Sequence, residues 1–447
     1  MDKKTEIIEL IKEAKYFEDL FDIPWKLQKK NSLKKADTKG LRIGLFNIPC
    51  GGFGDVIVCQ TFSEYLRSWY PNATVTVCTT TPEKFKSLGI NVNKGFATLV
   101  SKASDECAEF DQVRFKGKKP VFDMMIIVPI INKTFQIKRF QKLIPYANVF
   151  NSFPMSEYNG LFYPYTFPIG VGEENLGIFL TNPKLKKHSY VKGPYALVYI
   201  QPSPQWGIHS KYCFIAYMEM ISKKYSQKHK NFSLIIPEWI EEELFGNPQF
   251  KHQFKEKVHK YYPKVEIVPS GKVEEKESVK EFFFDESEKI RGKNKTNVLT
   301  IRCEILPKPR PEFMSIIKYS VEDVLLTGDQ SITDAFSCCS NKRIWYQIAP
   351  WKEDFAHNMS KEIPDVNFKT FKSSCGTLRS LHSKTDYKPF LKEYDFRIKG
   401  KKRTDAVIQS ILHNKDPVLQ DYMKIVQSSR YMDTVQAKFE KASKINF

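Results

Sequence analysis

The sequence lacks the paired cysteines and histidines of a zinc site. Its nine cysteines are scattered, none belongs to a CxxC pair, and the neighbours Cys338 and Cys339 cannot easily bridge each other. The eight histidines form no HExxH motif and have no cysteine at zinc-ligand spacing. We therefore expect no metal site, and cysteines that are reduced, buried thiols, as is usual inside cells.

Long apolar runs are also missing. The longest, such as MMIIVPII, are far shorter than the roughly 20 residues with which a helix crosses a bilayer. The N-terminus, MDKKTEIIELIKEAKYFEDLF, has acidic residues throughout and no apolar core of a signal peptide. Its apolar residues recur at helical spacing and predict an amphipathic helix. We expect a cytoplasmic protein that is soluble or at most peripheral to a membrane.

Negative charge is scarce relative to positive charge. Lysine and arginine number 70 against 51 aspartate and glutamate residues, so the formal net charge is +19. Such a charge predicts attraction to nucleotide phosphates, nucleic acid or an acidic membrane surface. A sequence that uses lysine only for solubility would carry the same charge. Clusters such as KLKKH and KGKKR are isolated runs, which are more typical of solvated faces than of a nucleic-acid groove.

Apolar strand-like segments alternate with helical ones, which predicts an α/β fold with parallel, doubly wound sheets. LRIGLFNI, ATVTVCTT, FATLV and FDMMIIVPI form a first set, and a second set begins at GPYALVYIQPSP and ends at EDVLLTG. The charged stretch KVEEKESVKEFFFDESEKIRGKNK is predicted to be a surface excursion. We divide the chain into an N-terminal helix and lysine-rich joint (1–40), a first Rossmann-like domain (41–190), a second one (191–372) and C-terminal helices (373–447).

The first strand is followed by a glycine-rich turn, CGGFGDVIVCQ, at the start of a predicted helix; it contains Gly51, Gly52, Phe53, Gly54 and Asp55. Ile57 stands where a dinucleotide fingerprint has its third glycine, and the Gly-Lys-[Ser/Thr] of a P-loop is absent. A carboxylate after such a turn can serve as a general base. Asp55 can equally be a favourable charge at a helix start.

The second junction is VLLTGDQSITDAFSCC. A strand is predicted to end at Thr327, Gly328 permits a turn, and a helix begins near Ser331. The N-terminus of this helix offers backbone N–H groups to a pyrophosphate, and Asp329 could bind ribose hydroxyls. Ser331-x-x-Asp334 is also a plain capping box, so a purely structural interpretation stays open.

Both junctions resemble GT-B glycosyltransferases of the heptosyltransferase and protein-arginine rhamnosyltransferase group. LFNIPCGGFGDVIVCQTFSEYL is similar to their first βα turn, and the segment from PKPRPEF to QIAPW is similar to the rhamnosyltransferase donor motif. The resemblance implies that Asp55 is the catalytic base, Asp329 the ribose-binding acid and Ser331 the phosphate-binding serine. It also implies a donor region that includes Gly328, Gln330 and Gln347. Lys211, in YIQPSPQWGIHSKYCF, is either a phosphate-contacting lysine or a surface lysine.

The sequence also departs from this family. Gly51 stands where the rhamnosyltransferases have a second aspartate, Thr327 replaces their arginine, and Ala349-Pro350-Trp351 replaces Tyr-Pro-Gln. The donor identity and the arginine acceptor therefore do not carry over. Because the chain has no DxD motif, the metal-dependent GT-A mechanism has no ligands. No carboxylate stands where it would attack the sugar, so direct displacement with inversion is the simpler mechanism.

The resulting hypothesis is a hexosyl- or deoxyhexosyltransferase. It would move a sugar from a nucleoside-diphosphate sugar to an acceptor of unknown class, namely a protein, a glycan, a lipid-linked sugar or a nucleic acid, and it would need no cofactor. Two alternatives stay open. One is another enzyme on the same fold, such as a nucleotide-sugar epimerase or a DNA-modifying glucosyltransferase, which the charge of +19 would suit. The other is a binding or structural protein that has lost the chemistry.

Overall fold

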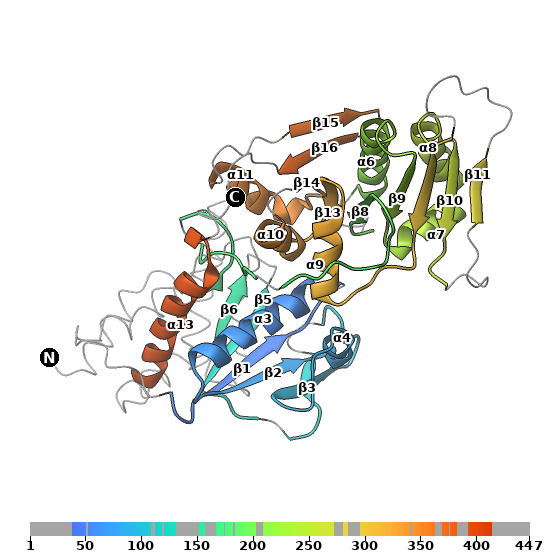
Figure 1. Ribbon diagram of the computed structural model, residues 1–447. Coiled ribbons are helices and arrows are strands. Elements are labelled where there is room, and N and C mark those ends of the chain that lie inside the picture. The colour runs from blue at the N-terminus through green and yellow to red at the C-terminus, as the bar shows by residue number, and fades with distance from the viewer. Residues whose placement is uncertain are drawn as a thin grey trace, which may run out of the picture. The chain divides into compact units, whose positions relative to one another are not determined.

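The computed structural model describes fifteen segments of the chain, namely residues 38–50, 52–108, 112–118, 120–130, 152–156, 167–173, 175–181, 184–202, 209–271, 280–284, 296–339, 342–362, 369–374, 376–381 and 392–413. The predicted N-terminal helix and Gly51 lie outside them. The chain divides into two compact units (Figure 1). Unit 1 comprises Met1–Phe179 and Tyr394–Phe447, and unit 2 comprises Leu180–Glu393.

Unit 1 is built on a sheet whose described strands have the order β4-β3-β2-β1-β5-β6-β7. The strands are β1 (Arg42–Asn47), β2 (Thr74–Thr79), β3 (Phe96–Ser101), β4 (Val113–Phe115), β5 (Met124–Ile130), β6 (Ser152–Ser156) and β7 (Phe167–Pro168). All neighbours are parallel except β3 and β4. Numbered along the chain, the parallel strands have the order 3-2-1-4-5-6, which is that of a Rossmann sheet.

Two helices follow the first strands of unit 1, α3 (Gly54–Trp69) and α4 (Pro82–Ser87). Val58, Phe62 and Leu66 recur at helical spacing in the sequence and are fully buried, and α3 packs on β1, β2 and β5. The helix ends two residues before Pro71, which cannot continue it. The prediction of an amphipathic helix after the glycine-rich turn is confirmed.

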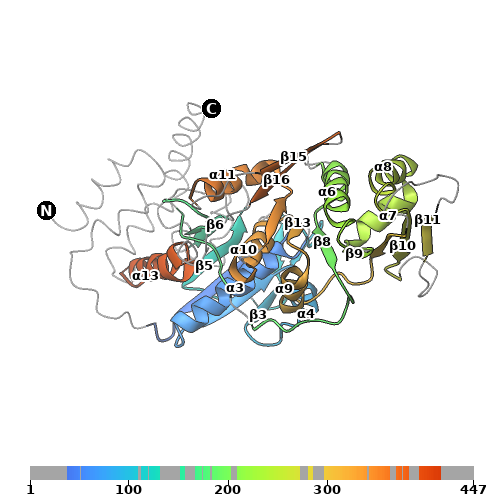
Figure 2. The ribbon, with the colours of Figure 1, turned by 45° about the horizontal axis from the view of Figure 1, so that its top comes forward.

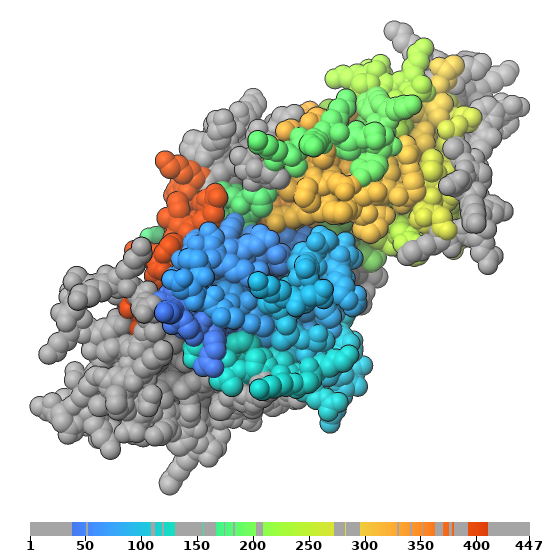
Figure 3. Space-filling view, turned by 60° about the horizontal axis from the view of Figure 1, so that its bottom comes forward, coloured from blue at the N-terminus to red at the C-terminus, as the bar shows by residue number. Residues whose placement is uncertain are grey.

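The last described helix, α13 (Phe396–His413), belongs to unit 1. The chain re-enters this unit beside Ile178, whose N–H donates to Tyr394 and whose carbonyl accepts from Phe396. The ring of Phe396 then packs among aromatic side chains of α3 and the segment before unit 2, namely Phe62, Tyr65, Trp69 and Phe179. The space-filling view shows α13, in orange-red, against the blue segments of the same unit (Figure 3).

Unit 2 contains the second sheet, with the described order β11-β10-β12-β9-β8-β13-β14-β16-β15. The strands are β8 (Tyr195–Tyr199), β9 (Asn231–Ile235), β10 (Lys264–Val268), β11 (Lys280–Phe284), β12 (Val298–Arg302), β13 (Asp323–Leu326), β14 (Arg343–Tyr346), β15 (Lys369–Ser373) and β16 (Gly376–Leu381). Strands β10-β12-β9-β8-β13-β14 are parallel and, numbered along the chain, have the order 3-4-2-1-5-6. The antiparallel strand β11 extends one edge, and β16 and β15 extend the other.

Two sequence-based assignments differ here. The charged stretch expected to be a surface excursion contains β11, and the segment expected to be C-terminal helices from residue 373 contains β16. Strand β11 is at one edge of the sheet and pairs with β10, whereas β16 lies between β14 and β15; the extended state of both comes from pairing within the sheet. Unit 2 also begins earlier than residue 191, at Leu180, and Thr181 contacts α9 (Arg310–Tyr319): its hydroxyl lies 3.9 Å from the Met314 sulfur.

The other helices of unit 2 are α6 (Ser210–Tyr225), α7 (Glu238–Gly246), α8 (Pro248–Val258), α10 (Asp329–Cys338), the 3-10 turn η3 (Pro350–Lys352) and α11 (Glu353–Glu362). Helix α6 packs with α8, and α9 packs with α10, as two separate pairs on the sheet (Figure 2). A continuous core of buried side chains, including Phe214, Leu234 and Ile301, joins the helices to the strands. The prediction of two mainly parallel α/β sheets is confirmed.

Candidate functional site

Each sheet has a point at which the strand order reverses, between β1 and β5 in unit 1 and between β8 and β13 in unit 2. Ligands of open α/β sheets bind outside the carboxyl ends of the strands at such a switch point. The glycine-rich turn follows β1, and the turn at Gly328 follows β13. Both predicted motifs therefore lie where this class of fold binds ligands.

Asp55 is the second residue of α3 and is 9% exposed. Its Oδ2 accepts a hydrogen bond from the backbone N–H of Cys50 at 2.8 Å, across the glycine-rich turn. This bond and the positive end of the helix dipole both favour the charged form of the carboxylate, the form that a general base requires. The same bond also closes the turn, so Asp55 has a structural role in addition to any chemical one.

Asn47, the last residue of β1, is a site residue that sequence reasoning missed. Its side chain is fully buried; Nδ2 donates to the carbonyls of Val128 (2.9 Å) and Asp55 (3.2 Å). Its Oδ1 accepts from the hydroxyl of Thr79 at 3.2 Å. Asn47 thus ties together β1, β2, β5 and the start of α3, and it fixes where Asp55 begins its helix.

The glycine-rich turn is held from its outer side as well. Cys50 forms a disulfide with Cys107, with a Cα–Cα distance of 4.5 Å, and the Cys107 N–H donates to Pro49 at 3.1 Å. Lys84, on α4, donates to the carbonyl of Gly52 at 3.4 Å and pairs with Glu106 at 2.7 Å. The expectation that all cysteines are reduced thiols is wrong for Cys50 and Cys107, whose separation of 57 positions hides their proximity from the sequence.

The other described cysteines are free, and most of them are buried. Burial raises the pKa of the Cys213 thiol to about 11 and that of Cys339 to about 12. It also raises the pKa of Cys59, on α3, well above its ordinary value. A thiol must ionise to act as a nucleophile, so these three cysteines are inert packing residues.

The turn itself does not require a glycine at Gly52. A Cβ added there would meet no atom within 4 Å, and its φ lies outside the left-handed region. Phe53, which precedes the helix, is half-buried, and Gly54 is the exposed first residue of α3. Neither packing nor the φ angle therefore explains a glycine at position 52.

In unit 2, Gly328 does require glycine, since its φ is +77°. Helix α10 begins directly after it at Asp329, two residues earlier than predicted. The expected capping box is not formed. The Ser331 hydroxyl donates to the carbonyl of Gly328 at 2.8 Å and to that of Thr327, and Asp334 pairs with Arg310 at 2.6 Å. The side chain of Asp329 lies outside the described part of the structure.

The two glutamines of the predicted donor region are buried. Gln330 Nε2 donates to Asp334 at 2.8 Å, while its Oε1 has no hydrogen-bond partner within the described residues. Gln347 is 2% exposed; its Oε1 accepts from the N–H of Gln201 at 3.0 Å, and its Nε2 donates to the Ser210 hydroxyl at 2.8 Å. Gln347 therefore fastens the ends of β14 and β8 and the start of α6 to one another.

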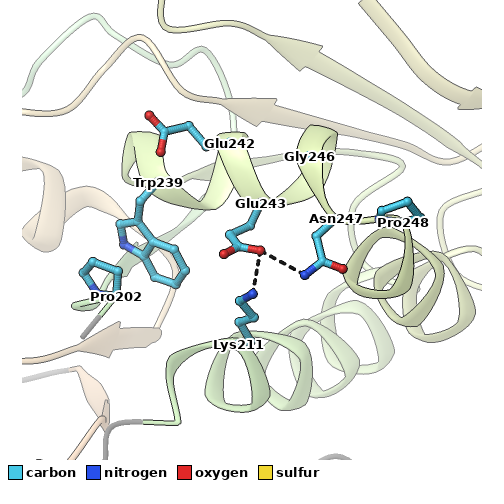
Figure 4. A pocket seen from close by; sticks show the side chains of 8 residues that line it. All are labelled: Pro202, Lys211, Trp239, Glu242, Glu243, Gly246, Asn247 and Pro248. Atoms are coloured by element: carbon cyan, nitrogen blue, oxygen red, sulfur yellow. Dashed lines mark hydrogen bonds and ion pairs between the residues drawn. The ribbon is translucent and has the colours of Figure 1, made fainter. Parts of the chain in front are cut away.

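Lys211 is the second residue of α6 and lies in a cavity of unit 2 (Figure 4). Its Nζ is 2.6 Å from Glu243 on α7, so it is paired with a carboxylate of the protein. In the described part of the chain, no group of three or more His, Cys, Asp or Glu residues is arranged to hold a metal ion. Nor does any described helix combine the length and apolarity needed to cross a membrane.

The chain matches no protein-family model and no curated protein. Among solved structures it is similar to a trehalose-6-phosphate synthase, OtsA, at 11% identity and a TM-score of 0.21, covering 94% of this chain and 70% of that one. It is similar to an apo structure of OtsA at 13% identity and a TM-score of 0.20, covering 95% of this chain and 75% of that one. Likeness at these scores carries no argument about fold or function, which must rest on strand order and site geometry.

Proposed function

We propose that the protein is a glycosyltransferase that uses a nucleoside-diphosphate sugar. The observation that carries the proposal is the start of α10 at the switch point of the second sheet. Gly328 has no side chain that could cap this helix, and the predicted capping residues Ser331 and Asp334 are engaged elsewhere. The first-turn N–H groups and the positive end of the helix dipole are thus suited to a diphosphate.

In this proposal Asp55 is the general base that removes a proton from the acceptor, and the sugar is displaced directly with inversion. The N–H groups of α10 stabilise the negative charge that develops on the leaving diphosphate, so that no metal is needed. The resemblance at both junctions supports these roles, with Asp329 on the ribose.

The donor half is tested by thermal unfolding with UDP, GDP, dTDP, ADP and CMP, with and without Mg²⁺. A ligand that binds only the folded state raises the unfolding temperature. At a hundredfold excess over Kd, it stabilises the folded state by about 2.7 kcal/mol. We expect one nucleoside diphosphate to do so without metal. Ser331→Asp should abolish that shift, because its carboxylate would stand beside the diphosphate. Ser331→Ala should preserve it, because the Ser331 hydroxyl donates to the carbonyls of Thr327 and Gly328, so the phosphate contact that the resemblance implied is left to the backbone N–H groups. Ser337→Asp, in the last turn of α10, is the charge-matched control.

The catalytic half is tested by two variants of Asp55, with water standing in for the acceptor and release of nucleoside diphosphate as the readout. Asp55→Asn keeps an oxygen for the Cys50 N–H but cannot take a proton, and Asp55→Ala removes both functions. We expect both variants to lose at least about 100-fold in turnover while the nucleotide shift is retained. Full turnover in Asp55→Asn together with loss in Asp55→Ala would make Asp55 structural only.

A further inference from the structure

A cavity of about 620 Å³ opens in unit 2, beside the carboxyl end of β8. This is within the size range of small-molecule sites, which is roughly 300–1,000 Å³. Figure 4 shows its lining side chains, which come from the loop after β8, from the first turn of α6 and from α7 and its junction with α8. The nucleotide site proposed above uses the start of α10 and none of these side chains, and Lys211, the possible phosphate contact of the sequence analysis, is paired with Glu243 instead.

One wall of the cavity is a fixed aromatic surface. Trp239, in the first turn of α7, donates its indole N–H to the carbonyl of Ile200 at 3.0 Å and packs against the core of the unit. Its only polar atom is thus already used, and what it presents to a ligand is ring surface. Pro202 contributes a second apolar ring to the lining. A wall of this kind favours a ligand with a flat C–H face or an apolar ring.

The second wall lies beside this ring, one turn further along α7, and is a polar chain of three side chains (Figure 4). Glu243 Oε2 lies 2.6 Å from the Lys211 ammonium and accepts from Asn247 Nδ2 at 3.2 Å. Asn247 is itself held, since its Oδ1 caps α8 by accepting the N–H of Phe250 at 3.1 Å. The carboxylate is therefore oriented, and no hydrogen bond to its other oxygen, Oε1, is found within the described residues. Lys211 and Glu243 keep 41% and 31% of their side-chain surface exposed.

These walls discriminate among ligand classes. Glu242 and Glu243 both line the cavity, against the single cation Lys211, so a phosphate or carboxylate would meet net negative charge. A wholly apolar ligand would strip water from the ion pair without replacing its hydrogen bonds. A neutral ring with several hydroxyls satisfies both walls: its hydroxyls donate to Glu243 Oε1 and accept from Lys211, and its C–H face covers Trp239.

We infer that this cavity binds a saccharide ring, separately from the diphosphate site at α10. Such binding does not depend on the proposed transfer reaction, because it needs neither Asp55 nor a nucleotide. The ring chemistry is shared by a free sugar and by the ribose of a nucleoside, and the experiment distinguishes them. If the transfer proposal also holds, this cavity gives unit 2 a second contact for a sugar-bearing molecule.

The test is calorimetric titration of the full-length protein with a panel of neutral mono- and disaccharides and with uridine and adenosine. We expect at least one compound to bind with a Kd below about 1 mM. Glu243→Gln, which removes the charge but keeps the shape, and Lys211→Met, which keeps the apolar stem, should each weaken it by about tenfold or more. Binding of a saccharide assigns a free sugar, whereas binding of nucleosides alone assigns the ribose.

Two matched control variants change the same residue types outside the cavity. Lys223→Met lies on the last turn of α6 and Glu256→Gln on exposed α8 surface, and both should leave affinity unchanged. Equal unfolding temperatures of the four variants verify that they fold. The inference is overturned if no compound binds, or if binding is indifferent to Glu243→Gln and Lys211→Met. Neither result bears on the Ser331→Asp nucleotide test, so the two proposals fail independently.

Discussion

At the residue scale, alanine variants of Gly52 and Gly328 distinguish a glycine that the fold does not need from one that it does need. Gly52→Ala adds a methyl group that meets no atom of the protein, whereas Gly328→Ala forces a side chain into a φ of +77°. We expect Gly52→Ala to leave the unfolding free energy within about 0.5 kcal/mol of the parent and Gly328→Ala to lower it by about 1–3 kcal/mol. Urea unfolding measures both.

The same Gly52→Ala variant makes a functional prediction. If the backbone at this turn approaches the acceptor, the methyl group occupies that space, and turnover of the nucleotide sugar should fall by at least about tenfold. Nucleotide binding, which we propose takes place at α10, should be unaffected. A variant that retains full turnover would show that the exposed turn contacts no substrate.

Lys342 is a buried residue whose protonation affects the stability of the protein in a measurable way. Its ammonium is buried and donates to the carbonyls of Ser320 (2.5 Å) and Val321 (3.0 Å). Burial lowers the pKa of Lys342 from 10.5 to about 8. Between these values the unfolded chain binds more protons than the folded one, so stability rises with pH in this window. The destabilisation that the buried ammonium of Lys342 causes is complete below about pH 8. It is lost as the pH approaches 10.5, the pKa of this lysine in the unfolded chain.

Lys342→Met isolates this effect. We expect the difference in unfolding free energy between parent and variant to move in favour of the parent by up to about 3 kcal/mol as the pH rises through this window. Urea unfolding at several pH values measures the difference. Lys318→Met, at an exposed position of α9, controls for the loss of one positive charge. A difference that does not change with pH would mean that the buried amine is charged in both states.

At the element scale, α13 completes unit 1 through one ring. Phe396 is fully buried among the aromatic side chains of α3, and Ile398, two residues later, is 59% exposed. Phe396→Ala should lower the unfolding free energy of unit 1 by about 3–5 kcal/mol, because it leaves a cavity. Ile398→Ala should change it by less than about 0.5 kcal/mol. Equal effects in thermal unfolding would mean that α13 is not part of this core.

How much was predictable also differs by element. The helix α3 was correctly predicted because the helical spacing of the apolar residues Val58, Phe62 and Leu66 is a local signal of its buried face. The strands β11 and β16 were not, because their extended state depends on pairing with β10, β14 and β15, which the charged composition of these segments does not indicate. In the cluster KGKKR, which was interpreted as a solvated face, the basic side chains are exposed or half-buried, and only Gly400 is buried, where an added Cβ would meet the ring of Phe396.

The candidate site was predictable only in part, for the same physical reason. Asp55 and Gly328 were found because a carboxylate and a glycine at strand–helix junctions are local signals. Asn47 gave no such signal, since its importance comes from bonds to Thr79 and Val128 on two other strands. The exact start of α10, which removes the capping box, depends on the backbone at Gly328 rather than on residue types.

At the scale of the whole molecule, the chain leaves unit 1 at Phe179 and returns to it at Tyr394. On the ribosome, Phe62 and Phe179 are made long before their partner Phe396. The whole of unit 2 emerges in between and can close its own core first, whereas domains made in succession normally fold from the N-terminus onward. Unit 1 must hold an incomplete aromatic core during that interval, so the part of this protein that is synthesised first is the part that finishes folding last.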